Sequence, residues 1–296
     1  MKSLISLLKV LIKSSLGLIF KDFSQFGAKN ILILGNGPSI NQQWDLIRQK
    51  RDSAQLMVVN KFAITDRFFD LKPEHYVFLD GAFFNFTEEI LQDPRIHPMV
   101  GIKENWEHSQ GEINKTWLNI LDADWPIVVW VPYIYRSSFI LEKLEKANIR
   151  FQFYNYTVID GWLKPALFKI KLGMPQSQNV INAAMAVSIW LKPKQVYVSG
   201  LDHTFHLNIS VDSDNYLWDE GDHFYKGKEQ VKKQKLIDFA TSKKVTLAAL
   251  FSSLAKVHLS YETLLSLSER NGVEIINVTE GGYVDAFKRS SLANLD

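Results

Sequence analysis

The chain has 296 residues, of which 46% are hydrophobic, 12% aromatic and 22% charged, and its formal net charge is +2. This composition is typical of a globular protein with a sizeable core, and the near balance of charge argues against a nucleic-acid binder, which usually carries a concentrated basic field. The absence of cysteine excludes disulfides, cysteine-ligated zinc and a thiol nucleophile, and suits a cytoplasmic protein.

The first twenty residues, MKSLISLLKVLIKSSLGLIF, are apolar but interrupted by lysines. Lysines at 9 and 13 and the lack of a small-residue cleavage site argue against a signal peptide and a membrane span. At about 100° per residue, the lysines gather in one narrow arc opposite an apolar face. We predict that residues 1–25 form an amphipathic helix on a membrane surface; docking on the protein's own body or a sister subunit is the alternative. The lysines are Lys2, Lys9 and Lys13, and the apolar face is Leu4, Leu7, Leu8, Leu11 and Leu18.

Apolar runs then alternate with helix-like segments along the rest of the chain. Such alternation predicts an α/β fold, with a mainly parallel sheet covered on both faces. We expect one Rossmann-like domain over 26–296, with a small mobile lid inserted at about 203–228. The predicted strands are 31–34, 55–60, 75–80, 126–134, 149–155, 195–202 and 273–282, and the predicted helices are 41–51, 135–147, 177–192 and a lysine-rich helix from about 229.

Small polar residues follow several of these strands. Ligands of open parallel sheets bind outside the carboxyl ends of the strands, so this recurrence predicts a site there. In the turn GNGPS, glycine allows close backbone approach, and the next helix offers free N–H groups to an anion. The turn lacks the P-loop and GxGxxG patterns, and an ordinary strand-to-helix turn is the alternative. The residues at the strand ends are Asn36, Gly37, Asn60, Asp80, Gly200 and Asp202.

Two Asp-x-Asp strings, at 122–124 and 212–214, have the spacing by which many sugar transferases hold a divalent ion. Such strings are common by chance, and we predict no metal site. His223 lies among acidic and aromatic residues in WDEGDHFYKGKE. Acidic neighbours would raise its pKa, which suits a proton acceptor near neutrality; the alternative is a surface histidine in a polar loop.

Four segments, ILILGNGPSI, VVNKFAITDRFF, VYVSGLD and DHFYKGK, occur in an order and spacing that resemble the bacterial sialyltransferases of glycosyltransferase family 42. The resemblance extends over about residues 29–280. It implies a GT-A-variant fold and a metal-independent, inverting glycosyltransferase. The first and third segments also resemble a wider bacterial group that includes an archaeal-type pterin diphosphokinase.

The resemblance assigns roles to individual residues. It places Asn36, Gly37 and Ser39 at the phosphate and ribose of the donor nucleotide, and Asn60 at the donor. Ser199, Gly200 and Asp202 would line the nucleoside pocket, and His223 would be the catalytic base.

The chain departs from the family where the donor sugar and phosphate would lie. Asp80 stands where the family commonly has asparagine, and only Asn179 of residues 177–180 could act in place of its Arg-x-Thr-Ser. His203 and Thr204 replace the tyrosines that steady the leaving phosphate, and the candidate substitutes for these tyrosines are Tyr216 and Tyr225.

The predicted reaction is a single displacement from a nucleotide sugar to a glycan hydroxyl, without obligatory Mg²⁺. A CMP-linked acidic sugar of the nonulosonate type is the favoured donor, and a UDP-sugar is the alternative. The acceptor would be a lipid-linked lipopolysaccharide or capsule chain at the inner face of the bacterial inner membrane. The oligomeric state stays open, with a homo-oligomer compatible.

Two other functional classes are compatible with the same motifs. An ATP-dependent diphosphokinase would bind ATP at GNGPS and would need magnesium on carboxylates such as Asp80, Asp122 and Asp124. A non-catalytic membrane-associated scaffold would keep the fold and bind no nucleotide.

Overall fold

The computed structural model describes residues 2–27, 30–84, 103–138, 140–141, 146–176, 179–219, 224, 233–237 and 243–295, with the backbone alone at 103–110 and 234.

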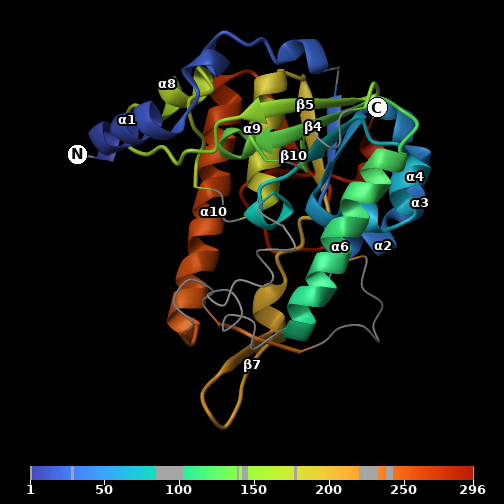
Figure 1. Ribbon diagram of the computed structural model, residues 1–296, viewed down its shortest axis with the longest axis vertical. Coiled ribbons are helices and arrows are strands. Elements are labelled where there is room, and N and C mark those ends of the chain that lie inside the picture. Colours follow the sequence, from blue (N-terminus) through green and yellow to red (C-terminus); the bar gives the residue numbers. More distant parts are fainter. Residues whose placement is uncertain are drawn as a thin grey trace.

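An eight-stranded sheet runs through the middle of the molecule (Figure 1) in the order β11-β10-β6-β1-β2-β3-β4-β5. Every neighbouring pair is parallel. All seven predicted strands occur. The strands are β1 Asn30–Leu34, β2 Gln55–Val59, β3 His75–Val77, β4 Ile127–Pro132, β5 Ile149–Tyr154, β6 Gln195–Ser199, β10 Glu274–Asn277 and β11 Lys288–Arg289.

Helices cover both faces of the sheet, as expected for a Rossmann-like α/β fold (Figure 1). Side chains alternate between the faces: Ile31 and Ile33 pack with α9 and α10, whereas Leu32 and Leu34 pack with α3, α4 and α6. All residues of α9 are buried, since it lies between the sheet and α10. The helices are α1 Lys2–Lys13, α2 Ser39–Gln42, α3 Trp44–Gln49, α4 Arg67–Leu71, α6 Lys103–Asp122, α8 Lys164–Lys169, α9 Val180–Leu191 and α10 Leu247–Arg270.

Two of the predicted helices differ in part from the structure. The predicted helix 135–147 starts later than expected, because residues 133–135 form a 3₁₀ turn. Residues 140 and 141 are helical, and residues 139 and 142–145 lie outside the described part. The lysine-rich helix expected from about 229 is wrong where the chain is described, because residues 234–235 pair with Trp218 and Asp219 as a strand. The long helix α10 begins only at Leu247, with Thr246 as its N-cap.

The segment between β6 and α10 contains a small antiparallel sheet. Its strands are β7 Ile209–Val211, β8 Leu217–Asp219 and β9 Gln234–Lys235, in that order. The Asp212 carboxylate organises the β7–β8 turn by accepting hydrogen bonds from the N–H groups of Asp214 and Tyr216 and from the Trp218 indole. These bonds lower the pKa of Asp212, since they favour its charged form.

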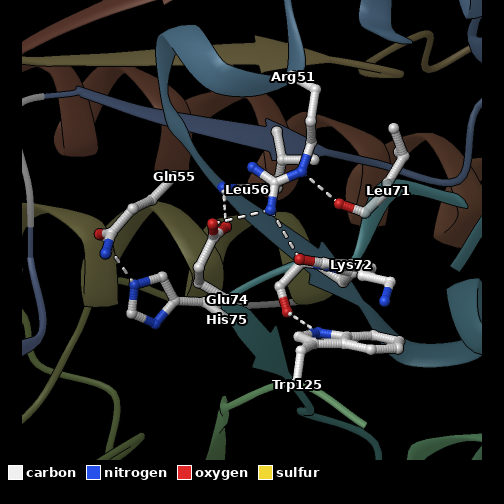
Figure 2. Close-up of polar contacts among 9 residues, drawn as sticks. Arg51, Gln55, Leu56, Leu71, Lys72, Glu74, His75 and Trp125 are labelled. Atoms are coloured by element: carbon white, nitrogen blue, oxygen red, sulfur yellow. Dashed lines mark hydrogen bonds and ion pairs between the residues drawn. The ribbon is translucent and has the colours of Figure 1, made fainter. Parts of the chain in front are cut away.

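Polar contacts close the amino ends of β2 and β3 (Figure 2). The Glu74 carboxylate accepts from Arg51 Nη2 at 2.8 Å and from the Leu56 N–H at 2.8 Å. Arg51 also donates to the carbonyls of Leu71 and Lys72. The arrangement satisfies backbone groups at this edge and leaves the opposite, carboxyl edge for function.

The amino-terminal segment packs on the face of the sheet that carries α9. Helix α1 ends at Lys13, so Leu18 is not on its apolar face as expected; it lies in a short 3₁₀ turn and is buried in the core. In the described part of the chain, no helix is both long and apolar enough to cross a bilayer.

Candidate functional site

The strand order changes direction between β1 and β6, which makes this pair the topological switch point of the sheet. The chain adds β2 to β5 on one side of β1, then returns to place β6, β10 and β11 on the other side. Leu34 of β1 is in register with Ser199 of β6, so both strands end at the same level. Ligands of open α/β sheets bind outside the carboxyl ends at such a switch point.

The turns that follow β1 and β6 are joined into one wall by hydrogen bonds. The Gly35 N–H donates to the Ser199 carbonyl at 2.8 Å, and the Gly37 N–H donates to the Gly200 carbonyl at 3.1 Å. The Asp202 carboxylate accepts from Ser39 N at 3.0 Å and from Ser39 Oγ at 2.8 Å. We call residues 35–39 and 199–202 the two-turn wall.

Glycine is required in this wall by close backbone approach. A Cβ on Gly37 would lie 1.8 Å from Asp202 Oδ2 and 2.7 Å from the Gly200 carbonyl. Gly200 has φ of +74°, in the left-handed region that favours glycine, and a Cβ there would lie 2.9 Å from the Gly35 carbonyl. The two glycines therefore allow the turns to meet.

Three polar residues predicted to contact a ligand are buried inside the wall. They are Ser39, Ser199 and Asp202. Ser199 Oγ donates to Gln43 Oε1 at 2.8 Å, and Ser39 bonds to Asp202 as described above. The Ser39–Asp202 contact holds the two turns together, and Ser199 ties the end of β6 to Gln43.

Asn36 and Asn60 lie side by side at the ends of β1 and β2, where Asn36 Nδ2 contacts the Val59 carbonyl at 3.4 Å. Asn60 has φ of +45°, and its backbone carbonyl accepts a hydrogen bond from the Tyr76 hydroxyl. Its side-chain Oδ1 is buried and has no hydrogen-bond partner among the described residues. Because an unpaired buried acceptor is costly, a ligand N–H or O–H at this position would be stabilised.

Phe224 attaches the segment after β6 to the wall. Its N–H donates to the Asn36 carbonyl at 3.1 Å, and its own carbonyl accepts from Asn41 Nδ2 at 3.2 Å. Its ring contacts Phe62, with the centroids 5.0 Å apart. The adjacent residues His223 and Tyr225 lie outside the described residues.

Arg67 lies under Phe224 and has no carboxylate partner within ion-pair distance in the described part of the chain. Its guanidinium carbon is 4.4 Å from the Trp44 ring centroid and 5.4 Å from that of Phe224. Its Nη1 is buried without a hydrogen bond among these residues, and burial lowers its pKa. Two aromatic rings thus hold a partly desolvated cation beside the wall.

The N-terminus of α9 carries a second set of polar groups. Asn179 Oδ1 caps the helix by accepting from the Asn182 N–H at 3.0 Å, and Asn179 Nδ2 donates to the Tyr261 hydroxyl at 2.9 Å. That hydroxyl is 2.7 Å from His203 Nε2. With Asn179 donating to it, the hydroxyl is free to donate its own proton to Nε2, and in that arrangement the neutral imidazole of His203 carries its proton on Nδ1.

His203 is held neutral by its surroundings. Burial, and secondarily the nearby His258, lower its pKa to about 4, because desolvation disfavours the charged form. Nδ1 has no hydrogen-bond partner among the described residues. In the Nδ1–H tautomer, His203 offers a buried N–H donor next to Asp202, a feature suited to binding an anionic oxygen.

The remaining candidates lie farther from the wall. Asp80 accepts from the Ala82 N–H at 2.9 Å at the end of β3, two strands from β1. Thr204 follows His203 and makes no side-chain cap to the next 3₁₀ turn. Tyr216 lies on the β7–β8 turn, where the Lys235 and Lys244 ammonium groups are 3.3 and 3.9 Å from its ring centroid.

Neither Asp-x-Asp string lies at the two-turn wall. Asp122 and Asp124 precede β4 and so lie at the amino edge of the sheet, where Asp124 pairs with Lys72 at 3.1 Å. The Asp212 carboxylate accepts its hydrogen bonds within the β7–β8 turn. Among the described residues there is no group of three histidine or acidic side chains arranged to hold a metal ion.

A surface hollow of about 500 Å³ lies away from this chemistry. It is bordered by Lys194 and Glu274 at the amino ends of β6 and β10, and by the carboxyl end of α10. Glu274 there pairs with Lys288 at 3.3 Å. We place the candidate site at the two-turn wall because its polar groups converge there.

Sequence reasoning gave no role in the site to Arg67, Phe224 and Tyr261. Arg67 lies within VVNKFAITDRFF and Phe224 within DHFYKGK, but neither segment indicates that the two side chains meet. Tyr261 lies in no motif and is 82 residues from Asn179. Their neighbourhood depends on how distant helices and loops pack.

No protein-family model matches the chain, and no curated protein matches it. Among solved structures, the chain is similar to the MAf glycosyltransferase from Magnetospirillum magneticum AMB-1, with 10% sequence identity and a TM-score of 0.46. The alignment covers 95% of this chain and 39% of that one.

Proposed function

We propose that this protein is a glycosyltransferase that moves a sugar from a nucleotide donor to a hydroxyl of a cell-surface glycan. The observation that carries the proposal is the two-turn wall at the switch point of the sheet, with Phe224 attached to Asn36. The motif resemblance to family 42 sialyltransferases supports it. That resemblance favours a CMP-linked nonulosonate-type sugar as donor and a lipid-linked lipopolysaccharide or capsule chain as acceptor.

The donor nucleotide would bind against the wall. Asn60 Oδ1, buried and without a partner among the described residues, would accept a hydrogen bond from the nucleoside. The phosphate would lie near the N-terminus of α9, where the helix dipole favours negative charge. His203 Nδ1–H would donate to it, and Thr204, Tyr216 and Tyr225 are further candidates on the same segment.

The reaction would be a single displacement. The acceptor oxygen forms a bond to the anomeric carbon as the bond from that carbon to the phosphate oxygen breaks, and the acceptor proton passes to His223. Hydrogen-bond donors would stabilise the charge that develops on the leaving phosphate, so Mg²⁺ would not be obligatory. A positioned base contributes typically about 10²–10⁴-fold in rate, and a lid over 203–228 would exclude water.

Nucleotide binding tests the proposal first. The melting temperature of the purified chain would be measured with CMP, CDP, UMP, UDP, GDP and ATP, each with and without magnesium. A ligand at a hundred times its Kd stabilises by about 2.7 kcal/mol. We expect a response to CMP that is independent of magnesium. A UDP response would change the donor, a magnesium-dependent ATP response would indicate a diphosphokinase, and no response from the folded protein would indicate a scaffold.

Transfer is tested next with His223→Ala. We expect this variant to keep the CMP-induced stabilisation and to lose transfer by about 10²-fold or more. His206→Ala is the matched control, because His206 lies in the same segment and packs against the Tyr283 ring, with the centroids 4.6 Å apart. If both variants transferred sugar at the same rate, His223 would not be the catalytic base. Separately, loss of transfer by the unaltered protein in EDTA would contradict a metal-independent reaction.

A further inference from the structure

Helix α1 docks on the protein through its small polar side. Ser3, Ser6 and Val10 are its buried residues. Ser6 Oγ donates to the Asp160 carbonyl at 3.1 Å and accepts from the Asp160 N–H at 2.8 Å. Just beyond the helix, Ser14 Oγ donates to the Leu172 carbonyl at 2.7 Å. Hydrogen bonds therefore set the orientation of α1 on the 155–172 segment.

The large apolar side chains of α1 point away from the protein. At about 100° per residue, the exposed leucines and isoleucines lie opposite the buried serines. This is the reverse of an ordinary surface helix, which turns its apolar stripe toward the core. The exposed residues are Leu4, Ile5, Leu8, Leu11 and Ile12, with Leu8 60% and Ile12 73% exposed.

Two aromatic residues from neighbouring segments are also exposed. Phe20 follows the 3₁₀ turn Leu16–Ile19 along the chain and is 88% exposed. Trp162, 81% exposed, follows Gly161, where an added Cβ would lie 2.2 Å from Ser3 Oγ. Trp162 therefore lies beside the first turn of α1, where Figure 1 shows α8 next to α1 at one end of the molecule, far from α6. Tryptophan is enriched where apolar and aqueous phases meet.

The charge of α1 is entirely positive. Its sequence, KSLISLLKVLIK, contains three lysines and no acidic residue. Lys2 is 3.6 Å from the Asp160 carboxylate, whereas Lys9 and Lys13 take part in none of the ion pairs found in the described part of the chain. These lysines lie in the arc between the docked side and the exposed apolar side, where their ammonium groups can reach lipid headgroups.

We infer that α1 and the adjacent Trp162 form a docking face, here called the α1 face, for the surface of an anionic lipid bilayer. A helix of 12 residues is about 18 Å long, too short for a hydrocarbon core of about 30 Å, so it would lie parallel to the membrane. The alternative occupant of this face is a second copy of the chain. An isologous dimer would bring the three lysines of each α1 together, and neither helix has a carboxylate to pair with them. This inference is independent of the proposed transferase activity.

Vesicle sedimentation tests the α1 face. The full chain would be mixed with vesicles of phosphatidylcholine alone or with about 30% phosphatidylglycerol. We expect it to sediment with the anionic vesicles and to be released by salt. The affinity should fall by about fivefold for each lysine removed, as in Lys9→Gln and Lys13→Gln, while Lys9→Arg should retain it.

The apolar contribution is tested with Leu8→Glu/Ile12→Glu, which should lose at least tenfold in vesicle affinity. Both positions are exposed, so the fold and the response to nucleotides should be unchanged. Leu118→Glu is the matched control, because Leu118 is 58% exposed on α6, and it should bind as the unaltered chain does. Equal binding by the α1 variant and the control would overturn the inference. So would a lipid-free dimer that the α1 variant converts to a monomer, since the face would then bind a second copy.

Discussion

Gly37 illustrates how a single residue decides whether the two turns can meet. The space that a Cβ would need is already filled by the Asp202 carboxylate and the Gly200 carbonyl. We predict that Gly37→Ala lowers the free energy of unfolding by about 1–3 kcal/mol, the usual cost of overpacking, and abolishes stabilisation by nucleotide. Urea unfolding and melting temperatures with CMP would measure both effects.

Gly111→Ala is the control for this change. Gly111 lies on α6, with no atom within 4 Å of an added Cβ, so alanine there should be neutral or stabilise by up to about 1 kcal/mol. If Gly37→Ala behaved like Gly111→Ala, the close packing of the two turns would not limit stability or binding.

His203 is the second residue whose environment sets its chemistry. Because its pKa is about 4 and Tyr261 donates to Nε2, the imidazole should be neutral from pH 5.5 to 8 with its proton on Nδ1. Nitrogen chemical shifts of labelled histidine would show this tautomer directly. In Tyr261→Phe, the Nδ1–H tautomer of His203 should no longer predominate, because the hydroxyl that donates to Nε2 is gone. If the Nε2–H tautomer predominated in the unaltered protein, the hydrogen-bond assignment would be contradicted.

At the scale of the element, Asn179 connects the start of α9 to α10. Its Oδ1 caps α9 and its Nδ2 bonds to Tyr261. We predict that Asn179→Ala costs about 1 kcal/mol or more of unfolding free energy, because both contacts are lost and an uncapped helix alone costs about that much. Asn179→Asp keeps an acceptor for the cap and replaces the Nδ2 donor by a carboxylate oxygen.

Comparing the two variants separates the cap from the link to His203. In urea unfolding, Asn179→Asp should be the more stable, whereas both should change the nitrogen shifts of His203. Equal stability of the two would mean that the cap contributes little to α9, whose fully buried apolar side chains would then account for its position.

At the scale of the whole molecule, stability should fall in mild acid because of a buried core histidine. The indole N–H of Trp130 donates to His75 Nδ1, and His75 Nε2 faces Gln55 Oε1 (Figure 2). These contacts suit a neutral imidazole, because a second proton on Nδ1 would meet the indole N–H. Burial lowers the pKa of His75 to about 4. The unfolded chain therefore binds more protons than the folded chain between about pH 4 and 6.5, and stability is lost as the pH falls through this range.

For His75 alone the loss should be about 2 kcal/mol between pH 7 and pH 5, with His203 acting in the same direction. Urea unfolding at these pH values would measure it. His75→Gln should be less stable at pH 7 but show a smaller loss at pH 5, and His206→Gln should keep the full loss. The same pH dependence in both variants would exclude His75 as the cause.

The sheet and the positions of its turns can be predicted from the sequence alone. Apolar runs such as ILIL and QLMVV mark β1 and β2, because strands buried on both faces need continuous apolar side chains. Small polar residues after these runs mark the carboxyl edge, and Asn36, Gly37, Gly200 and Asp202 all lie there. The lysines of the first helix already showed its polar arc.

Only the tertiary structure decided which side chains meet. Ser39 and Asp202 are 163 residues apart in sequence, and their bond makes them part of the wall. Tyr261 reaches His203 from a helix with no motif, and α1 turns its serines inward and its leucines outward. The physical reason is that strands and turns follow from local apolar patterns, whereas these contacts depend on the packing of elements distant in sequence, which a local pattern does not encode.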